Sequence, residues 1–291
     1  MCRGYFYGFS RTYDFYFSVN PDLKNRKREL ISLIGRDYSL SDEPCTLVVL
    51  PYIQSRAQGR EIEITLDGWR KFCKFNYHFV VIGEFATSLI EKYPWVDFIL
   101  KKRVDKREGQ YMPHLDIISK FMFVANKYKG IYDGFIYMVD DNYSIKSFEL
   151  SDIMTSHYLS SDFIGNEKAP KSYWNYDKWK TRQLLDREGL PHINYTTHYP
   201  YYMEFSKLEE IVERYDLLHE SYVFDDLYFN YFEHDTPINV NKVRFGIWNK
   251  SIFKNGFQKA VENPEIKFMC NSVEGWSKEL ENSLEVIVKN T

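Results

Sequence analysis

Cysteine is scarce and scattered in this sequence. The four cysteines, Cys2, Cys45, Cys73 and Cys270, form no CxxC pair, so neither a disulfide framework nor a zinc site is indicated, and a reducing compartment is expected. No window reaches the roughly 18 consecutive apolar residues of a membrane span. The opening segment MCRGYFYGFSRTYDF lacks the apolar core of a signal peptide. We therefore expect a soluble, cytoplasmic protein without a membrane span.

Several common motifs and a dominant charge are also missing. The sequence has no GxGxxG, GxxxxGK[ST], HExxH or GxSxG, which weakens dinucleotide, P-loop, zinc-protease and hydrolase interpretations without excluding them. With 38 basic and 41 acidic side chains, the formal net charge of -3 provides no general attraction to nucleic acid or anionic membranes. Two local runs are basic, Lys24 to Arg28 and Lys101 to Arg107, and we expect both to be solvated faces.

Aromatic residues, by contrast, are abundant. The chain has 24 Tyr, 22 Phe and 6 Trp, which together make 18% of its 291 residues. A chain of this length buries about three quarters of its unfolded surface and can form a large core. The aromatic content exceeds what that core needs, so some aromatic side chains should line a surface groove.

Short apolar runs alternate with helical stretches from residue 45 onward. The runs expected to be strands lie at 45–53, 77–84 and 96–102, with TLDGWRKFCKF and ATSLIEKY as helices between them. A helix is expected over 112–128, and then a strand over 134–145, GFIYMVDDNYSI. Alternating strands and helices predict a mostly parallel central sheet with helical crossovers, as in α/β proteins.

The remaining sequence is less regular. We expect a helix that ends at Gly189 and another over 206–220, capped by Ser206. In the first forty residues, an amphipathic helix capped by Asn20 is the clearest feature. No linker, repeat or low-complexity tract appears. The sequence therefore predicts a single α/β domain over residues 45–291, with residues 1–44 as an extension packed on it.

The segment Phe135 to Asn142 carries the strongest chemical signal. An apolar strand here runs directly into Asp140, Asp141 and Asn142. The two adjacent carboxylates repel one another, so their presence at this position suggests that a cation is bound between or beside them. Ligands of open α/β sheets collect at the carboxyl ends of strands, and oxygen ligands suit Mg²⁺ or Mn²⁺ bridging to a diphosphate. The alternative is a simple turn in which these side chains bond their own backbone.

Four stretches together resemble the nucleotide-sugar-dependent glycosyltransferases of the GT-A fold, especially the bacterial and phage group related to capsular-polysaccharide and Stealth-type transferases. They are LVVLPYIQSR, PHLDIISK, FIYMVDDNY and NYTTHYPYYMEFSKLEEI. A fifth, KFMCNSVEGWSKELENSLEVIV, is similar to that group's closing element, and the resemblance covers about residues 45–288. The most specific feature is TTHYP following WNYDKWKTRQLL. The usual DxD spacing falls here on Asp140 and Asn142 with Asp141 between, which leaves open which of the three contacts metal.

The resemblance implies a donor-binding group. Pro51, Tyr52 and Arg56 become candidates for base stacking and phosphate contact, since a guanidinium can bind a diphosphate in a forked manner. Asp116 and Lys120 lie four apart on a helix that passes over the nucleotide and ribose in the resembling proteins. The alternatives are a surface arginine and a plain i,i+4 ion pair worth about 0.3–0.5 kcal/mol.

The resemblance also implies a metal group. Asp141, with Asp140, would hold the Mn²⁺ or Mg²⁺ ion that offsets charge on the departing nucleoside diphosphate. Asn142 is a further candidate ligand, and His198 would complete the metal site from the C-terminal half. As neighbours at a strand end, Asp140 and Asp141 should point to opposite faces, with Asp140 toward the ribose.

Residues 174–182 offer weaker candidates. Lys180 and Arg182 could meet phosphate or lie as ordinary helix residues along the surface. Trp174, Tyr176 and Trp179 could stack on sugar faces or form a packed aromatic stripe.

An inverting transfer requires a base that takes the acceptor's proton. Asp225 and Asp226, within an apolar and aromatic run, are the best candidates, because burial raises a carboxyl pKa. The same pair also fits the N-terminus of a helix, where negative charge is favourable.

Taken with the resemblance, these residues predict metal-dependent transfer of a sugar from a nucleotide-activated donor to a hydroxyl. The acceptor is expected to be a glycan, or a modified base in phage DNA that the basic runs would suit. Two alternatives remain: a Stealth-like sugar-phosphate transferase, and a non-catalytic carbohydrate-binding protein.

Overall fold

The computed structural model describes residues 45–104, 112–162, 165–171, 174–232 and 237–290. The expected extension over 1–44, its helix and its basic run lie outside these residues, as does the end of the second basic run. Among the described residues, no helix combines the length and apolar character needed to cross a bilayer.

The described chain alternates strands and helices in its first half and becomes more varied after residue 140. The strands are β1 (Thr46–Ile53), β2 (Tyr77–Glu84), β3 (Val96–Leu100), β4 (Gly134–Tyr137), β5 (Asn142–Ser144), β6 (His157–Tyr158), β7 (Tyr201–Glu204), β8 (Ile238–Asn239), β9 (Arg244–Ile247) and β10 (Phe268–Asn271). The α-helices are α3 (Glu61–Phe72), α4 (Thr87–Lys92), α5 (Pro113–Tyr128), α6 (Ser151–Met154), α7 (Trp174–Glu188), α8 (Phe205–Arg214), α9 (Phe224–Phe232), α10 (Lys250–Glu262) and α11 (Lys278–Asn290). The 3-10 turns are η1 (Gln54–Arg56) and η2 (Val240–Lys242).

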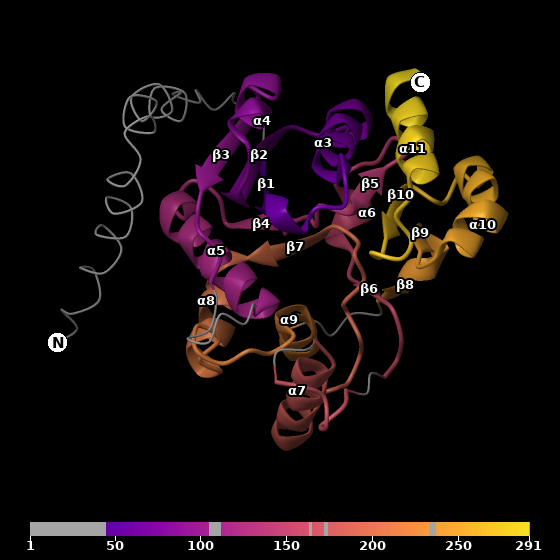
Figure 1. The fold of residues 1–291 in the computed structure, drawn as a ribbon. Helices are drawn as coiled ribbons and strands as arrows, with labels where there is room; N and C mark the ends of the chain where they lie inside the picture. Colours follow the sequence, from indigo (N-terminus) through magenta and orange to yellow (C-terminus); the bar gives the residue numbers. More distant parts are fainter. Residues whose placement is uncertain (1–44, 105–111, 163–164, 172–173, 233–236, 291) are drawn as a thin grey trace. The chain divides into compact units, whose positions relative to one another are not determined.

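The central sheet has five strands in the order β3-β2-β1-β4-β7. Strands β1 to β4 are mutually parallel, and β7 runs antiparallel to β4 at the edge (Figure 1). The expectation of a mostly parallel sheet flanked by helices is confirmed, and the runs at 45–53, 77–84 and 134–137 share it.

Helices cover both faces of this sheet because its strands are apolar on both sides. Leu47 and Val49 of β1 point into a core formed with α5, α7, α8 and α9. Val48 and Leu50 point the opposite way, into a core formed with α3 and α4. Figure 1 shows α3 and α4 on one side of the sheet and α5, α8 and α9 on the other.

The strand expected over 134–145 is interrupted, which corrects the sequence prediction. The chain turns after β4, and β5 joins a different sheet of order β5-β10-β9. Helices α10 and α11 pack on this second sheet through a third apolar core. The turn thus carries the chain from the large sheet to the small one.

Two helix ends test the capping predictions. The helix before Gly189 ends as expected, with Gly189 in the left-handed region at φ 69. Helix α8 instead has Glu204 at its N-cap position and ends at Arg214, so the predicted Ser206 cap and the extension to 220 are wrong. Asp216 adopts φ 50 just beyond this end, a conformation that cannot continue a right-handed helix.

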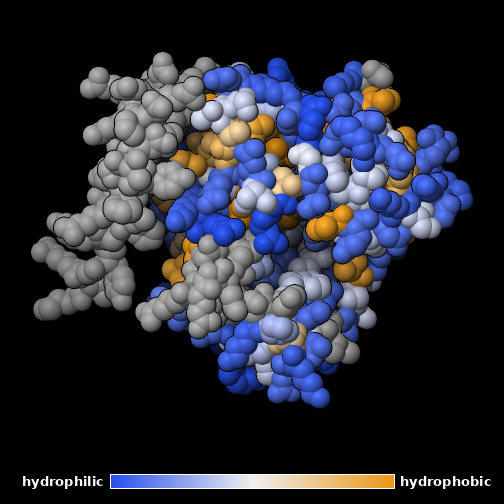
Figure 2. All heavy atoms as spheres, in the orientation of Figure 1, coloured by the Kyte–Doolittle hydropathy of each residue, from blue (hydrophilic) through white to orange (hydrophobic). Residues whose placement is uncertain are grey.

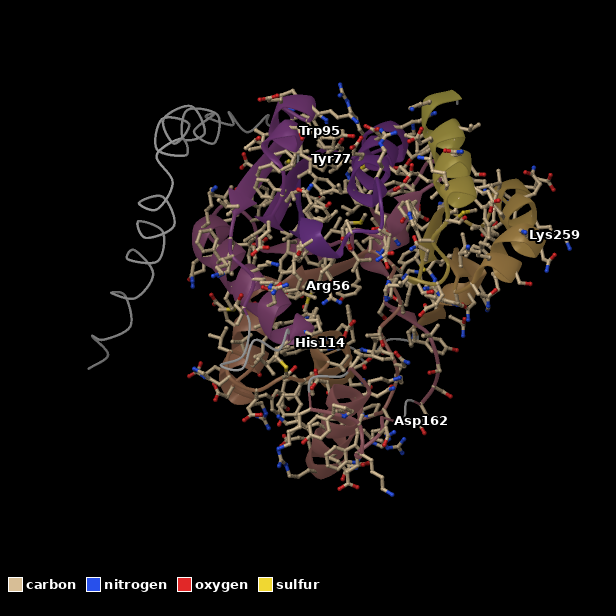
Figure 3. The ribbon with its side chains drawn as sticks, in the orientation of Figure 1. Arg56, Tyr77, Trp95, His114, Asp162 and Lys259 are labelled. Carbon is tan, nitrogen blue, oxygen red and sulfur yellow. The ribbon has the colours of Figure 1, made fainter. Side chains whose placement is uncertain are left out.

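Hydrophilic residues dominate the face of the molecule seen in Figure 2, and apolar residues are confined to patches. Arg56 follows β1 on this face, and His114 lies in the first turn of α5 (Figure 3).

Candidate active site

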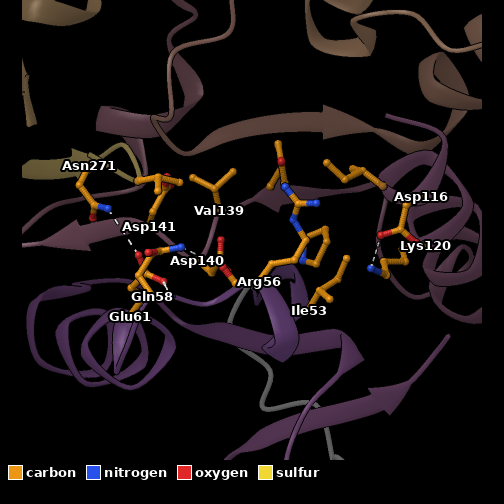
Figure 4. A pocket seen from close by; sticks show the side chains of 14 residues that line it. Ile53, Arg56, Gln58, Glu61, Asp116, Lys120, Val139, Asp140, Asp141 and Asn271 are labelled. Carbon is orange, nitrogen blue, oxygen red and sulfur yellow. Dashed lines mark hydrogen bonds and ion pairs between the residues drawn. The ribbon is translucent and has the colours of Figure 1, made fainter. Parts of the chain in front are cut away.

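A cleft lies at the carboxyl ends of β1 and β4, where ligands of open α/β sheets are expected. Six side chains singled out in the sequence line it: Pro51, Arg56, Asp116, Lys120, Asp140 and Asp141 (Figure 4). They come from the loop after β1, from α5 and from the turn after β4.

The turn after β4 forms the acidic end of the cleft. The backbone N–H of Asn142 donates to the carbonyl of Val139 at 3.3 Å and closes the turn. The buried Thr65 hydroxyl of α3 lies 2.9 and 3.0 Å from the carbonyl oxygens of Asp140 and Asn142, which anchors the turn from below. Both Asp140 and Asp141 line the cleft. The expectation that they face opposite sides is wrong, because the strand's alternation ends before them.

His198 faces this turn from the C-terminal half. Its Nδ1 lies 3.1 and 3.2 Å from the carboxylate oxygens of Asp141. The residue has φ 47, a conformation unusual for a side chain other than glycine. Its carbonyl accepts from Asn142 Nδ2 at 2.5 Å, and the neighbouring Thr197 carbonyl accepts from the buried Arg244 guanidinium. These contacts hold the strained segment in place.

Asn142 therefore has a positioning contact in this structure. It is fully buried and does not line the cleft, since its amide is directed at the His198 backbone. The prediction of Asn142 as a metal ligand is not supported by this orientation, which follows from its place in β5 beyond the turn.

Two polar residues at the acidic end were not singled out in the sequence, Glu61 and Asn271. Glu61 begins α3, and its carboxylate accepts from the backbone N–H of Gln58 at 2.7 Å. Asn271 ends β10 and approaches the other Glu61 oxygen at 3.4 Å, while its own oxygen accepts from the Tyr143 hydroxyl at 2.5 Å. A sequence signal existed only for Glu61, which follows the loop after the first strand.

The acidic end gathers carboxyl groups whose environment favours the protonated form. Burial, together with the Asp141 and Glu61 carboxylates, raises the pKa of Asp140 to about 8. Burial also raises the pKa of Glu61 above its usual range. The Asp141 carboxylate raises the pKa of His198. A group of carboxyls with raised pKa values in a cleft is typical of a site that receives a cation.

The buried pair of Asp116 with Lys120 lies at the other end of the cleft, and Arg56 lies between this pair and the acidic turn (Figure 4). The Lys120 ammonium lies 2.5 Å from the Asp116 carboxylate, and both side chains are 1% exposed. The second Asp116 oxygen accepts from the backbone N–H of Val104 at 2.9 Å. The pair is thus no surface ion pair. Lys120 and Arg56 are the two cationic side chains among the described residues that line the cleft.

Three predicted donor contacts lie elsewhere. Tyr52 is 3% exposed and packs in the core under α3, because alternation along β1 turns it away from the cleft wall formed by Pro51. Lys180 pairs with Glu220, and Arg182 pairs with Asp162 at 2.8 Å, both on the surface of α7. These three residues do not line the cleft.

Asp225 and Asp226 occupy the first turn of α9, as the helix alternative predicted. The fully buried Asp226 accepts from the backbone N–H of Tyr195 at 2.5 Å, which fits a structural role. Burial raises the pKa of Asp225 to about 6, an effect that nearby His198 partly offsets. Asp225 is 6% exposed and does not line the cleft.

The side chains at the acidic end are of the chemical types that bind a divalent metal ion. Within the described ranges, no three or more His, Cys, Asp or Glu side chains are gathered as a complete metal site. Asp141 and His198 nevertheless face one another, and burial with the neighbouring Asp141 and Glu61 carboxylates raises the pKa of Asp140. Carboxylate oxygen and imidazole nitrogen are ligands that Mn²⁺ accepts, and carboxylates also suit Mg²⁺.

Comparison with known proteins gives structural likeness only. No protein-family model matches the chain, and no curated protein matches it. The WbbM bifunctional glycosyltransferase is similar with a TM-score of 0.49 and 11% identity, over 87% of this chain and 50% of that one. Mouse xyloside xylosyltransferase 1 is similar with a TM-score of 0.43 and 10% identity, over 80% of this chain and 99% of that one. A glycosyltransferase involved in glycosylation of the major capsid of PBCV-1 has a TM-score of 0.42 and 13% identity, over 84% and 100%.

The chain therefore spans half the length of the WbbM structure. Identities of 10–13% and TM-scores below 0.5 leave any functional argument to the residues of the cleft.

Proposed function

We propose that this protein is a glycosyltransferase that moves a sugar from a nucleotide-activated donor to a hydroxyl group. The observation that carries the proposal is the cleft itself. It joins the acidic turn of Asp140 and Asp141, faced by His198, to the exposed Arg56 at the carboxyl ends of parallel strands. A nucleoside diphosphate needs both a cation-binding group and a cationic side chain, and this cleft offers the two together.

Asp141 and His198 are the residues that would hold Mn²⁺ or Mg²⁺ in this proposal, with the Asp140 carboxyl beside them. When bound, such an ion supplies positive charge that offsets the charge of the leaving diphosphate. Thr65 and Asn142 act on the protein side by fixing the turn and the His198 backbone. The ligand groups are thereby positioned before the donor arrives.

Beside the acidic turn, Arg56 would contact the donor's phosphate or base, and Pro51 would pack against the base. Asp225 is the group proposed to accept the acceptor's proton, because a carboxyl with a pKa of about 6 remains largely ionised near neutral pH and is more basic than an ordinary aspartate. We propose a glycan as the acceptor, since the net charge of -3 does not favour DNA.

Thermal unfolding with a panel of nucleoside diphosphates, with and without Mn²⁺, tests the proposal. Binding at a hundredfold excess over Kd should stabilise the fold by about 2.7 kcal/mol. For a domain of this size that free energy raises Tm by roughly 5–10 °C. A Tm that no nucleotide changes, with or without metal, would reject the transferase. Release of a nucleoside monophosphate from the donor would indicate sugar-phosphate transfer instead.

A further inference from the structure

Trp248 presents an exposed indole beside the acidic end of the cleft. It follows β9 directly, and 39% of its surface is exposed. Large apolar side chains occur singly on protein surfaces, so exposure alone assigns no role. The way this indole is held, and what it adjoins, separate it from an ordinary surface tryptophan.

The indole is fixed from several sides. The ring lies so close to Gly246 that a Cβ there would come within 2.5 Å of its Cζ2 atom. The Arg244 guanidinium lies 5.2 Å from the ring centroid, and the Ser272 hydroxyl donates to the Trp248 carbonyl at 3.0 Å. Arg244 is itself buried and tied to the Thr197 carbonyl. A rigid aromatic surface loses little conformational entropy when a ligand binds to it.

The indole also adjoins the proposed reaction centre. Its ring meets the His198 imidazole edge to face, with centroids 6.1 Å apart and an interplanar angle of 81°. The same imidazole contacts the Asp141 carboxylate through its Nδ1. Val273, the residue after Ser272, is 65% exposed and lines the cleft. Trp248 thus lies near the acidic end.

We propose that Trp248 is the stacking platform for a pyranose ring of the acceptor, an inference that rests on the proposed transferase function. A pyranose presents a face of C–H groups to an aromatic ring and directs its hydroxyls outward. Here those hydroxyls meet an imidazole and the carboxylates of the acidic end. The position suits the acceptor better than the donor's base, which the proposal places within the cleft with Pro51 and Arg56.

Trp174 provides a matched control. It is 41% exposed and has its own cation, the Lys178 ammonium at 4.3 Å from the ring, but it lies at the start of α7, whereas Trp248 packs against His198. If Trp248 has no ligand, replacing it should leave pyranoside binding unchanged, as we expect for Trp174. If Trp248 stacks on a sugar, replacing it should weaken that binding.

The test follows the indole N–H resonances of the full chain by NMR while methyl pyranosides of several common hexoses are added. The resonance that disappears in Trp248→Phe identifies Trp248. We expect this resonance to shift with at least one pyranoside, and we expect Trp248→Ala to weaken that binding about tenfold or more, equivalent to about 1.4 kcal/mol. Trp174→Ala should leave the affinity unchanged. Unshifted remaining indole resonances in Trp248→Ala show that the variant is folded.

Gly246→Ala is a second variant that retains the indole but displaces it. It should weaken pyranoside binding while nucleoside diphosphate and Mn²⁺ still raise Tm as in the unaltered protein. If nucleotide binds but no pyranoside shifts the Trp248 resonance, the platform is refuted and the transferase proposal survives. A shift caused by free nucleoside instead would place the donor's base here and overturn the assignment. If no nucleotide binds at all, the transferase and the acceptor role fail together.

Discussion

The buried pair of Asp116 and Lys120 allows a sharp test of how the cleft is built. The two charges lie 2.5 Å apart with 1% of either side chain exposed. Lys120→Met removes one charge and leaves the Asp116 carboxylate buried, with the Val104 N–H still donating to it. Breaking a buried pair in this way costs about 3–5 kcal/mol, roughly ten times what a surface i,i+4 pair is worth.

Urea unfolding of the single and double variants measures this cost. Lys120→Met alone should lower the free energy of unfolding by most of this ~3–5 kcal/mol. Adding Asp116→Asn should restore much of it, because the amide is neutral and its oxygen still accepts from Val104. Lys289→Met is the matched control, since Lys289 pairs with Glu285 at i,i+4 on an exposed helix face and should change stability by less than about 0.5 kcal/mol.

A loss below about 1 kcal/mol for Lys120→Met would refute the reasoning, because it would mean that water reaches the pair and that the surface-pair estimate holds. The double variant also separates structure from function. If it is stable yet no longer binds nucleoside diphosphate, then the charged pair contacts the donor besides stabilising the fold.

Three further outcomes are expected. Asp141→Asn should slow sugar transfer by about 10² to 10³, or about 3–4 kcal/mol, and raise the Mn²⁺ concentration that turnover requires; turnover measured against Mn²⁺ concentration checks this. Asp225→Asn should lower kcat by about 10² to 10⁴ with donor binding retained, as single-turnover kinetics would show. Burial lowers the pKa of His114 to about 4. The unfolded chain therefore takes up that proton first, and stability present above about pH 6.5 declines toward pH 4 by up to roughly 3 kcal/mol, a decline that urea unfolding should find reduced in His114→Asn.

The strands of the large sheet could be predicted because local patterns specify them. Residues 77–84 are apolar on both faces and bounded by polar residues, and β2 occupies that same range. The position of the acidic residues after β4 could also be predicted from the sequence. Ligands of open α/β sheets bind at the carboxyl ends of the strands, and paired carboxylates directly after a buried strand indicate such a site.

The orientation of individual side chains was harder to predict. Pro51 and Tyr52 are adjacent in β1, so period-two alternation allows only one of them to face the cleft. For Asp140 and Asp141 the opposite error arose, because alternation was applied to residues that belong to a turn. Sequence patterns describe a strand well, but they do not show where the strand stops.

The other wall of the cleft was beyond prediction from the sequence. Glu61 meets Asn271 across 210 residues, and no spacing or period in the sequence links them. Trp248 was missed for the same reason, since its neighbour His198 is distant in sequence and reaches it through a left-handed backbone conformation. Only the packing of the second sheet brings these residues together.

The contact between Glu61 and Asn271 also determines how early in protein synthesis the site can form. At about 5–20 residues per second, a ribosome needs roughly 10–40 s to add the 210 residues between them. In the later part of that interval the nascent chain already carries the Asp140 and Asp141 carboxyls, while β10, which pairs with β5 beside them, has not been made. The acidic end is therefore completed only late in synthesis, and under the proposed function a chain still being translated should bind neither metal nor donor.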